Sequence, residues 1–243
     1  MWRVLRPADW VRQRSRRAVY RRPDGGLVRL LPGGLRRGAP LPPRGERRVE
    51  VGSGFNPRPG YIHVDVVPGL PDLHLVARAD RLPFADGWCD EILAVHMIEH
   101  VPAGALRTVL ATWHRQLAPG GVLTLHTPNG TALASVLARS DEVPVEHIWA
   151  VQSAVYGYNR APWDANSPDA VGMEPDHKLL FTFPLLSRVL TEAGFTDVAD
   201  ISGSDPHCHH TRDWAPYVPG LCLEVRAVKS PTQRQAPPSP SST

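Results

Sequence analysis

Short apolar runs alternate with helix-like patterns along the middle of the chain. Apolar and β-branched residues predict five strands, namely Arg48–Val51, Tyr61–Val66, Glu91–Val95, Val122–His126 and Leu221–Val228. Apolar residues at helical spacing predict helices over Gly104–Leu117 and Pro184–Ala193, and Gly194 stands where a helix commonly ends. Strands that alternate with helices indicate an α/β fold with a mainly parallel sheet.

The same pattern divides the chain into parts. Residues 1–47 are predicted to be a basic N-terminal arm and linker, and residues 48–229 a single domain. Residues 230–243, rich in Pro, Ser and Gln, are expected to be a disordered tail. Residues 139–180 look irregular and rich in aromatic side chains, which predicts an insertion that either covers a ligand crevice like a lid or packs as an ordinary subdomain.

Composition narrows the class of protein. The chain has 243 residues, 42% of them hydrophobic, so it can bury one full core. No apolar run approaches the roughly 20 residues that span a bilayer. The three cysteines are widely spaced and odd in number, which argues against a disulfide framework. We therefore expect a cytoplasmic protein without a membrane span.

The formal charge of +3 hides an asymmetry. Residues 1–48 hold 14 arginines against three acidic residues, a balance of +11, and the rest of the chain has a balance of −8. The arm is therefore either a contact for nucleic acid or an anionic membrane surface, or a solvated extension that packs on the acidic body.

Candidate chemistry begins after the first strand of the domain. Val49-Glu-Val-Gly-Ser-Gly-Phe55 predicts a buried strand and a glycine turn, and Tyr61-Ile-His-Val-Asp65 predicts a second strand that ends in an acid. Glycines let the backbone approach a ligand, and a carboxylate at this place suits ribose hydroxyls.

Further motifs follow in a fixed order. They are Asp80-Arg-Leu-Pro-Phe84, Asp86-Gly-Trp-Cys-Asp90, Glu99-His100-Val101 and Leu117-Ala-Pro-Gly-Gly121. With the glycine turn, this ordered set resembles the class I S-adenosylmethionine-dependent methyltransferases of the type 11-like group. The resemblance is close over residues 48–130, loose over 175–228, and says nothing about the arm. It implies a doubly wound, seven-stranded Rossmann-like sheet.

The resemblance also implies a cofactor, S-adenosyl-L-methionine, and roles for individual residues. Glu50 would hold the methionyl amino group, Gly52, Ser53 and Gly54 would let the backbone approach, and Asp65 would bind the ribose hydroxyls. Asp80 would accept from the adenine amino group, with Arg81 and Leu82 flanking the ring.

The connection between the glycine turn and the second strand is unusually short. Only six residues separate Gly54 from Tyr61, whereas a parallel crossover normally takes a dozen or more. We expect the first helix to be missing or reduced to a turn, which leaves that side of the pocket open.

Histidines near predicted strand ends are candidates for the chemistry, since histidine is a common general base. We predict His96 and His177 as catalytic residues and note His126 at the end of the next strand. The segment His96-Met-Ile-Glu99-His100 also matches an inverted zinc-protease signature, but its place in the methyltransferase order argues against a protease.

Metal binding remains an alternative at these residues. Some related O-methyltransferases bind a divalent metal through Glu-x-x-Glu-His and a later His. Here His96 replaces the first Glu, and Mg²⁺ prefers oxygen ligands, so the predicted site contains no metal ligand. We expect His207-Cys-His-His210 to be a polar loop, because adjacent residues rarely all face one ion.

The sequence thus predicts methyl transfer to oxygen or nitrogen of a small metabolite or sugar. Two alternatives stay open: a nucleic-acid methyltransferase that uses the basic arm, and a noncatalytic binding protein on the same fold. The oligomeric state is not indicated.

Overall fold

The computed structural model describes residues 18–21, 27–31, 34–35, 46–54, 56–67, 70, 72–144, 151–152, 154–157, 177–204 and 220–231. In the domain, the strands are β4 (Arg48–Val51), β5 (Ile62–Asp65), β6 (Leu75–Val76), β7 (Cys89–Val95), β8 (Leu117–Pro128), β9 (Phe195–Asp200) and β10 (Cys222–Lys229). The helices are α2 (Ala103–Gln116), α3 (Gly130–Ala138) and α5 (Phe183–Glu192), with the short 3₁₀ helices η1 (Ala79–Arg81), η2 (Ile98–His100) and η3 (Ser140–Glu142).

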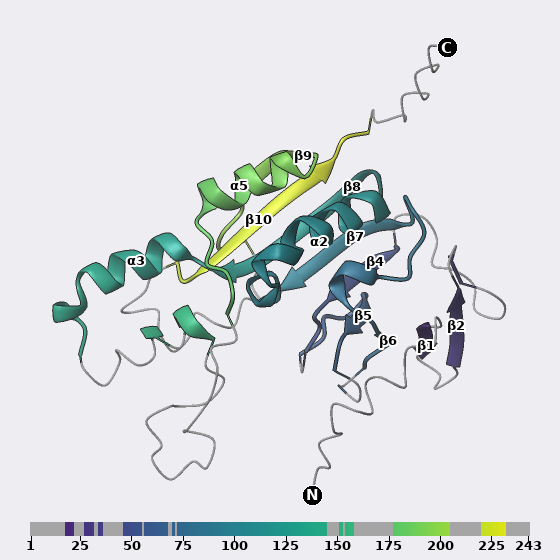
Figure 1. Ribbon diagram of the computed structural model, residues 1–243, viewed down its shortest axis with the longest axis horizontal. Coiled ribbons are helices and arrows are strands. Elements are labelled where there is room, and N and C mark those ends of the chain that lie inside the picture. The colour runs from purple at the N-terminus through teal and green to yellow at the C-terminus, as the bar shows by residue number, and fades with distance from the viewer. Residues whose placement is uncertain are drawn as a thin grey trace, which may run out of the picture.

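These strands form one seven-stranded sheet in the order β6-β5-β4-β7-β8-β10-β9 (Figure 1). All neighbours from β6 to β8 pair in parallel, and β10 is antiparallel to both β8 and β9. The prediction of a mainly parallel, seven-stranded Rossmann-like sheet with flanking helices is confirmed.

The chain winds in two directions from the centre of this sheet. It enters at β4, proceeds outward through β5 and β6, and returns to place β7 on the other side of β4. The direction of winding therefore reverses between β4 and β7. In open α/β sheets the ligand crevice lies at such a reversal, beyond the carboxyl ends of the strands.

No helix connects β4 and β5 in the described part of that segment, which lacks only residue 55. Turns and bends carry the chain across instead, in agreement with the expectation from the short spacing. The amide of Gly52 donates to the carbonyl of Val64 at 2.7 Å, so the turn closes directly onto β5.

Most predicted elements lie within a few residues of the observed ones, and Gly194 has the expected positive φ of 98°. Two features were not predicted. The motif Leu117-Ala-Pro-Gly-Gly121 is an irregular stretch within the longer strand β8, where the register against β7 shifts. The elements β6, β9 and α3 have no predicted counterpart, because β6 is very short and β9 exposes most of its residues.

Helices α2 and α5 complete the core of the domain. Trp113 of α2 and Leu186 of α5 are fully buried against sheet residues such as Ile92, Leu125 and Val225. Helix α3 extends away from the sheet (Figure 1), and its Leu133 belongs to a separate small apolar cluster.

Three short strands of the arm form a second, antiparallel sheet, in the order β1 (Ala18–Arg21), β2 (Leu27–Leu31) and β3 (Gly34–Leu35). Residues 1–17, 22–26, 32–33 and 36–45 of the arm, most of the predicted insertion, residues 207–210 and residues 232–243 of the tail lie outside the described residues. The described part of the insertion includes η3 and helical residues 151–152 and 154–156. Within the part of the chain that the structure describes, no helix has the length and apolarity to span a membrane.

Candidate functional site

The glycine turn that follows β4 lies against the segment that follows β7. Gly52 and Gly54 have positive φ values of 75° and 56°. A side chain at Gly52 would collide with Met97, because its Cβ would stand 2.7 Å from the Cβ of Met97. A side chain at Gly54 would meet no atom of the described residues within 4 Å. Glycine at position 52 thus allows close packing of the two segments, and among the described residues the side of the turn at Gly54 is open.

Asp65 lies beside this turn at the end of β5. Its Oδ2 accepts a hydrogen bond from the amide of Gly54 at 3.1 Å, and its Oδ1 accepts from the amide of Val67 at 2.9 Å. Each carboxylate oxygen has two lone pairs, so the group keeps capacity for further donors. The structure therefore brings Asp65 together with the predicted glycine residues.

Glu50 lies in β4, just before the glycine turn, and is buried, with 2% of the residue exposed. Its Oε2 accepts from the amide of Arg58 at 2.8 Å and lies 3.6 Å from Nε2 of His63. Burial raises the pKa of Glu50, and the Arg58 amide and the charge of His63 act in the opposite direction. Glu50 thus ties the end of β4 to the short connection.

The ring of His63 contacts the short connection between β4 and β5 and the segment that precedes β6. It pairs with Glu50 in the β4–β5 register and is 5% exposed. Its Nε2 lies 2.7 Å from the carbonyl oxygen of Arg58, and its Nδ1 lies 3.0 Å from that of Asp72. Both partners are acceptors, so the ring satisfies both only when both nitrogens carry hydrogen. His63 was not among the predicted site residues, because its place opposite Glu50 depends on the register between β4 and β5.

Asp80 lies in η1, which follows β6. Arg78 binds its carboxylate through Nε at 2.8 Å and through a second nitrogen at 3.2 Å, and this hydrogen bonding lowers the pKa of Asp80. The Arg81 side chain is 81% exposed and 3.9 Å from the same carboxylate. Leu82 is buried in the core, 6% exposed.

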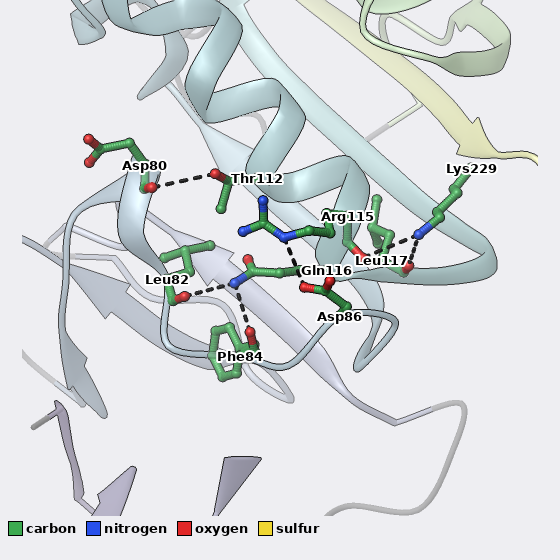
Figure 2. Close-up of polar contacts among 9 residues, drawn as sticks. All are labelled: Asp80, Leu82, Phe84, Asp86, Thr112, Arg115, Gln116, Leu117 and Lys229. Atoms are coloured by element: carbon green, nitrogen blue, oxygen red, sulfur yellow. Dashed lines mark hydrogen bonds and ion pairs between the residues drawn. The ribbon is translucent and has the colours of Figure 1, made fainter. Parts of the chain in front are cut away.

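Helix α2 fixes the segment that carries Asp80 (Figure 2). The hydroxyl of Thr112 donates to the carbonyl of Asp80 at 3.4 Å. The side-chain amide of Gln116 donates to the carbonyls of Leu82 and Phe84 at 2.7 and 3.0 Å. Asp80 therefore stands on a backbone that is anchored at several points.

The two predicted catalytic histidines converge on one buried carboxylate. Nδ1 of His96 lies 3.2 Å from Oε1 of Glu99, and Nε2 of His177 lies 4.0 Å from the same oxygen. His96 has a φ of 47°, a left-handed conformation that is uncommon outside glycine and often marks a functional site. Glu99 is completely buried, and its Oε2 has no hydrogen-bond partner among the described residues.

The hydrogen bonds of His177 determine which nitrogen can act as a base. Its Nδ1 lies 3.1 and 3.3 Å from the carbonyl oxygens of Ala154 and Val155, so Nδ1 carries the hydrogen. The lone pair of Nε2 then faces the Glu99 side. Burial lowers the pKa of His177, with a smaller lowering from His100, whose ring lies edge-on at 4.8 Å.

A second polar cluster lies where β8 and β10 pair. One ligand atom each from His126, Cys222 and Glu224 lies within 4.8 Å of the others, and all three residues are buried. Sγ of Cys222 also lies 3.6 Å from Nε2 of His96. Glu99, His100 and His177 form another such group. Sequence analysis noted His126 alone, because nothing in the sequence indicates that β10 enters beside β8.

Part of the chain matches a known protein family. Residues 63–125 match the model of a family described as a methyltransferase domain. No curated protein sequence matches the chain.

Several solved structures are similar at low identity. A SAM-dependent methyltransferase from Thermotoga maritima, described as a possible histamine N-methyltransferase, has 17% identity and a TM-score of 0.49, with 76% of this chain and 82% of that chain covered. A SAM-dependent methyltransferase from Archaeoglobus fulgidus has 16% identity and a TM-score of 0.48, with coverage of 76% and 87%. The CurJ carbon methyltransferase has 19% identity and a TM-score of 0.46; 78% of this chain is covered, but only 50% of that one.

Proposed function

We propose that this chain, a class I S-adenosylmethionine-dependent methyltransferase, methylates oxygen or nitrogen of a small metabolite or sugar. The observation that carries the proposal is the Glu99 carboxylate. One of its oxygens faces His96 and His177, and the other is buried without a partner in the described part of the chain. A group that donates O–H or N–H would satisfy that second oxygen.

The residues at the carboxyl ends of β4 and β5 fit S-adenosylmethionine. The open space at Gly54 leaves room for a ligand against the backbone, and the Ser53 hydroxyl is buried without a partner among the described residues. Asp65 would bind the ribose hydroxyls and Glu50 the methionyl amino group. Asp80 would accept from the adenine amino group, flanked by Arg81 and Leu82. When bound, the cofactor supplies an electrophilic methyl group on a sulfonium.

On the acceptor side, the chain's own residues position the acceptor and remove a proton. Glu99 Oε2 accepts a hydrogen bond from an O–H or N–H beside the reacting atom of the acceptor, and His96 holds Oε1 so that the carboxylate keeps its orientation. His177 Nε2 takes the proton that the acceptor loses, because its Nδ1 hydrogen is committed to backbone carbonyls. Positioning supplies much of the rate in such an in-line transfer.

Titration calorimetry with S-adenosylmethionine and transfer of a labelled methyl group test this function together. We expect binding that weakens in Asp65→Ala and Asp80→Ala. We also expect label to enter the small-molecule fraction of a cell extract, and Glu99→Gln to abolish that transfer while cofactor binding persists.

Other results would contradict the proposal in distinct ways. Label that enters RNA or DNA, and is lost when residues 1–47 are deleted, would support the nucleic-acid alternative, with its strong salt dependence. Absence of cofactor binding would support a noncatalytic binding protein.

A further inference from the structure

A buried group of metal-type ligands lies outside the residues just assigned to proton removal. His126 of β8 and Glu224 of β10 are direct partners in the antiparallel register. Cys222 stands two residues before Glu224, on the same face of β10, since side chains alternate along a strand. Two paired strands thus present three ligand atoms to one point, within 4.8 Å of one another.

All three residues are buried, which is unusual for a glutamate and for a histidine. His126, Cys222 and Glu224 are 2%, 4% and 1% exposed. The residue between the last two, Leu223, belongs to the apolar core on the opposite face. Buried ionisable groups are usually paired, hydrogen-bonded or bound to a metal.

His96 lies at the distance from Cys222 that two ligands of one zinc ion would have. A sulfur about 2.3 Å and a nitrogen about 2.0–2.1 Å from one tetrahedral zinc ion are about 3.6 Å apart. The measured separation between Cys222 Sγ and His96 Nε2 is 3.6 Å. The other nitrogen of His96, Nδ1, faces the Glu99 carboxylate at 3.2 Å. A metal-bound histidine commonly donates its second N–H to such a carboxylate.

Glu224 also has the surroundings of a metal ligand. Its Oε1 accepts from the amide of Gly203 at 3.3 Å, and its Oε2 accepts from the hydroxyl of Ser204 at 3.3 Å. Ligating carboxylates are themselves usually hydrogen-bonded in this way. The bonds fix the carboxylate and leave further lone pairs for an ion.

We propose that His126, Cys222 and Glu224 bind one divalent transition-metal ion of the Zn²⁺ class, with water or the adjacent His96 as the fourth ligand. The thiolate and the imidazole exclude Mg²⁺ and Ca²⁺, which take oxygen ligands. Binding displaces the Cys222 thiol proton to solvent. His96 connects this site to the Glu99 carboxylate, because its Nε2 faces Cys222 and its Nδ1 faces Glu99. The site differs from Glu99, His100 and His177, and it does not depend on the proposed function.

Replacement with cobalt tests the site in the full-length protein. We expect one Co²⁺ per chain and a thiolate-to-cobalt charge-transfer absorption. Cys222→Ser should abolish that absorption and weaken binding by at least about tenfold. The matched control is Cys89→Ser, since Cys89 is also a buried free thiol but lies in β7 outside the cluster. It should keep both the absorption and the affinity.

Three results would overturn the proposal: no stoichiometric metal, an absorption that survives Cys222→Ser, or binding that depends on His177 and not on Cys222. The second result would point to Cys208, which lies outside the described residues. Because Cys222→Ser could fail to fold, X-ray absorption on the zinc-loaded wild-type protein provides a check without mutation. One sulfur and three nitrogen or oxygen neighbours are expected, and a shell without sulfur would refute the site.

Discussion

Nδ1 of His96 lies 3.2 Å from Oε1 of Glu99, which joins the end of β7 to a carboxylate that water does not reach. This contact holds one oxygen of Glu99, and the other oxygen, Oε2, has no hydrogen-bond partner among the described residues. His96 adopts a left-handed backbone conformation at the same place. The strain is thus located at the residue that holds the carboxylate.

Glu99→Gln tests the part that this carboxylate has in methyl transfer. The amide keeps the size of the side chain but loses the charge and one acceptor. We expect kcat to fall by about 100-fold or more, the usual range for a group that assists proton transfer. The affinity for S-adenosylmethionine, measured by calorimetry, should stay unchanged.

Glu91→Gln is the control for that experiment. Glu91 is a partly exposed carboxylate on β7 that accepts from the hydroxyl of Tyr61 at 2.6 Å, away from the two histidines. Its loss should leave kcat nearly unchanged. Equal losses of activity in both variants would show that Glu99 has only a structural effect.

The pH dependence of kcat/KM tests His177. The base must be neutral, and burial lowers the pKa of His177 below its ordinary value of 6.5. Activity should therefore persist as the pH falls through 6.5 and decline only below it. His177→Gln should remove this acid limb together with most of the activity.

The variant His100→Gln tests whether the acid limb of the kcat/KM profile belongs to His177. His100 contributes to the lowering of the His177 pKa, and Glu99 acts in the opposite direction. His100→Gln should therefore shift the acid limb to higher pH without removing it. A limb that keeps its position in His100→Gln and remains in His177→Gln would belong to another group.

The sequence allowed most of the central sheet to be predicted, because strand, glycine turn and acid occur there in a fixed order. Arg48–Val51 is observed as predicted, and the missing helix before Ile62 followed from the six-residue spacing alone. Local patterns of this kind depend only on neighbours in the chain.

The candidate site depended on contacts that neighbours do not determine. The apolar pattern of β10 is the same in either direction along the sheet, so its antiparallel pairing with β8 was not evident. The contact of Cys222 with His96, 126 residues apart in the chain, follows from that pairing. The role of Glu99 as a common partner of His96 and His177 likewise required the fold.

Gly52→Ala tests the contact between the glycine turn and the segment after β7. The methyl group would collide with Met97, and φ is 75°. We expect a loss of stability beyond the roughly 1–2 kcal/mol that a left-handed conformation costs a residue with a Cβ. Cofactor affinity should fall as well, because the turn must shift.

Gly54→Ala separates the cost of the left-handed backbone conformation from the cost of the collision with Met97. Gly54 has a φ of 56°, but a Cβ there would meet nothing within 4 Å. This variant should show the backbone cost alone in urea denaturation. Equal losses of stability in Gly52→Ala and Gly54→Ala would mean that packing against Met97 has no effect.

Gln116→Met tests how α2 supports the segment that carries Asp80 (Figure 2). Gln116 is 1% exposed, and its amide donates to the carbonyls of Leu82 and Phe84. Methionine has a similar shape but no donor, so two carbonyls lose their partner. Leaving a buried polar group unpaired costs about 1–3 kcal/mol, which urea denaturation should detect.

Arg115 and Asp86 form an ion pair at 2.8 Å on the surface of the same region, and this pair provides the control. Their side chains are 56% and 66% exposed, and exposed pairs contribute at most about 1 kcal/mol. Asp86→Asn should therefore change stability little and leave cofactor affinity intact, whereas Gln116→Met should lower both, since the segment that directly follows η1 loses two hydrogen bonds to α2. A larger loss in Asp86→Asn than in Gln116→Met would contradict the view that buried hydrogen bonds from α2 hold Asp80 in place.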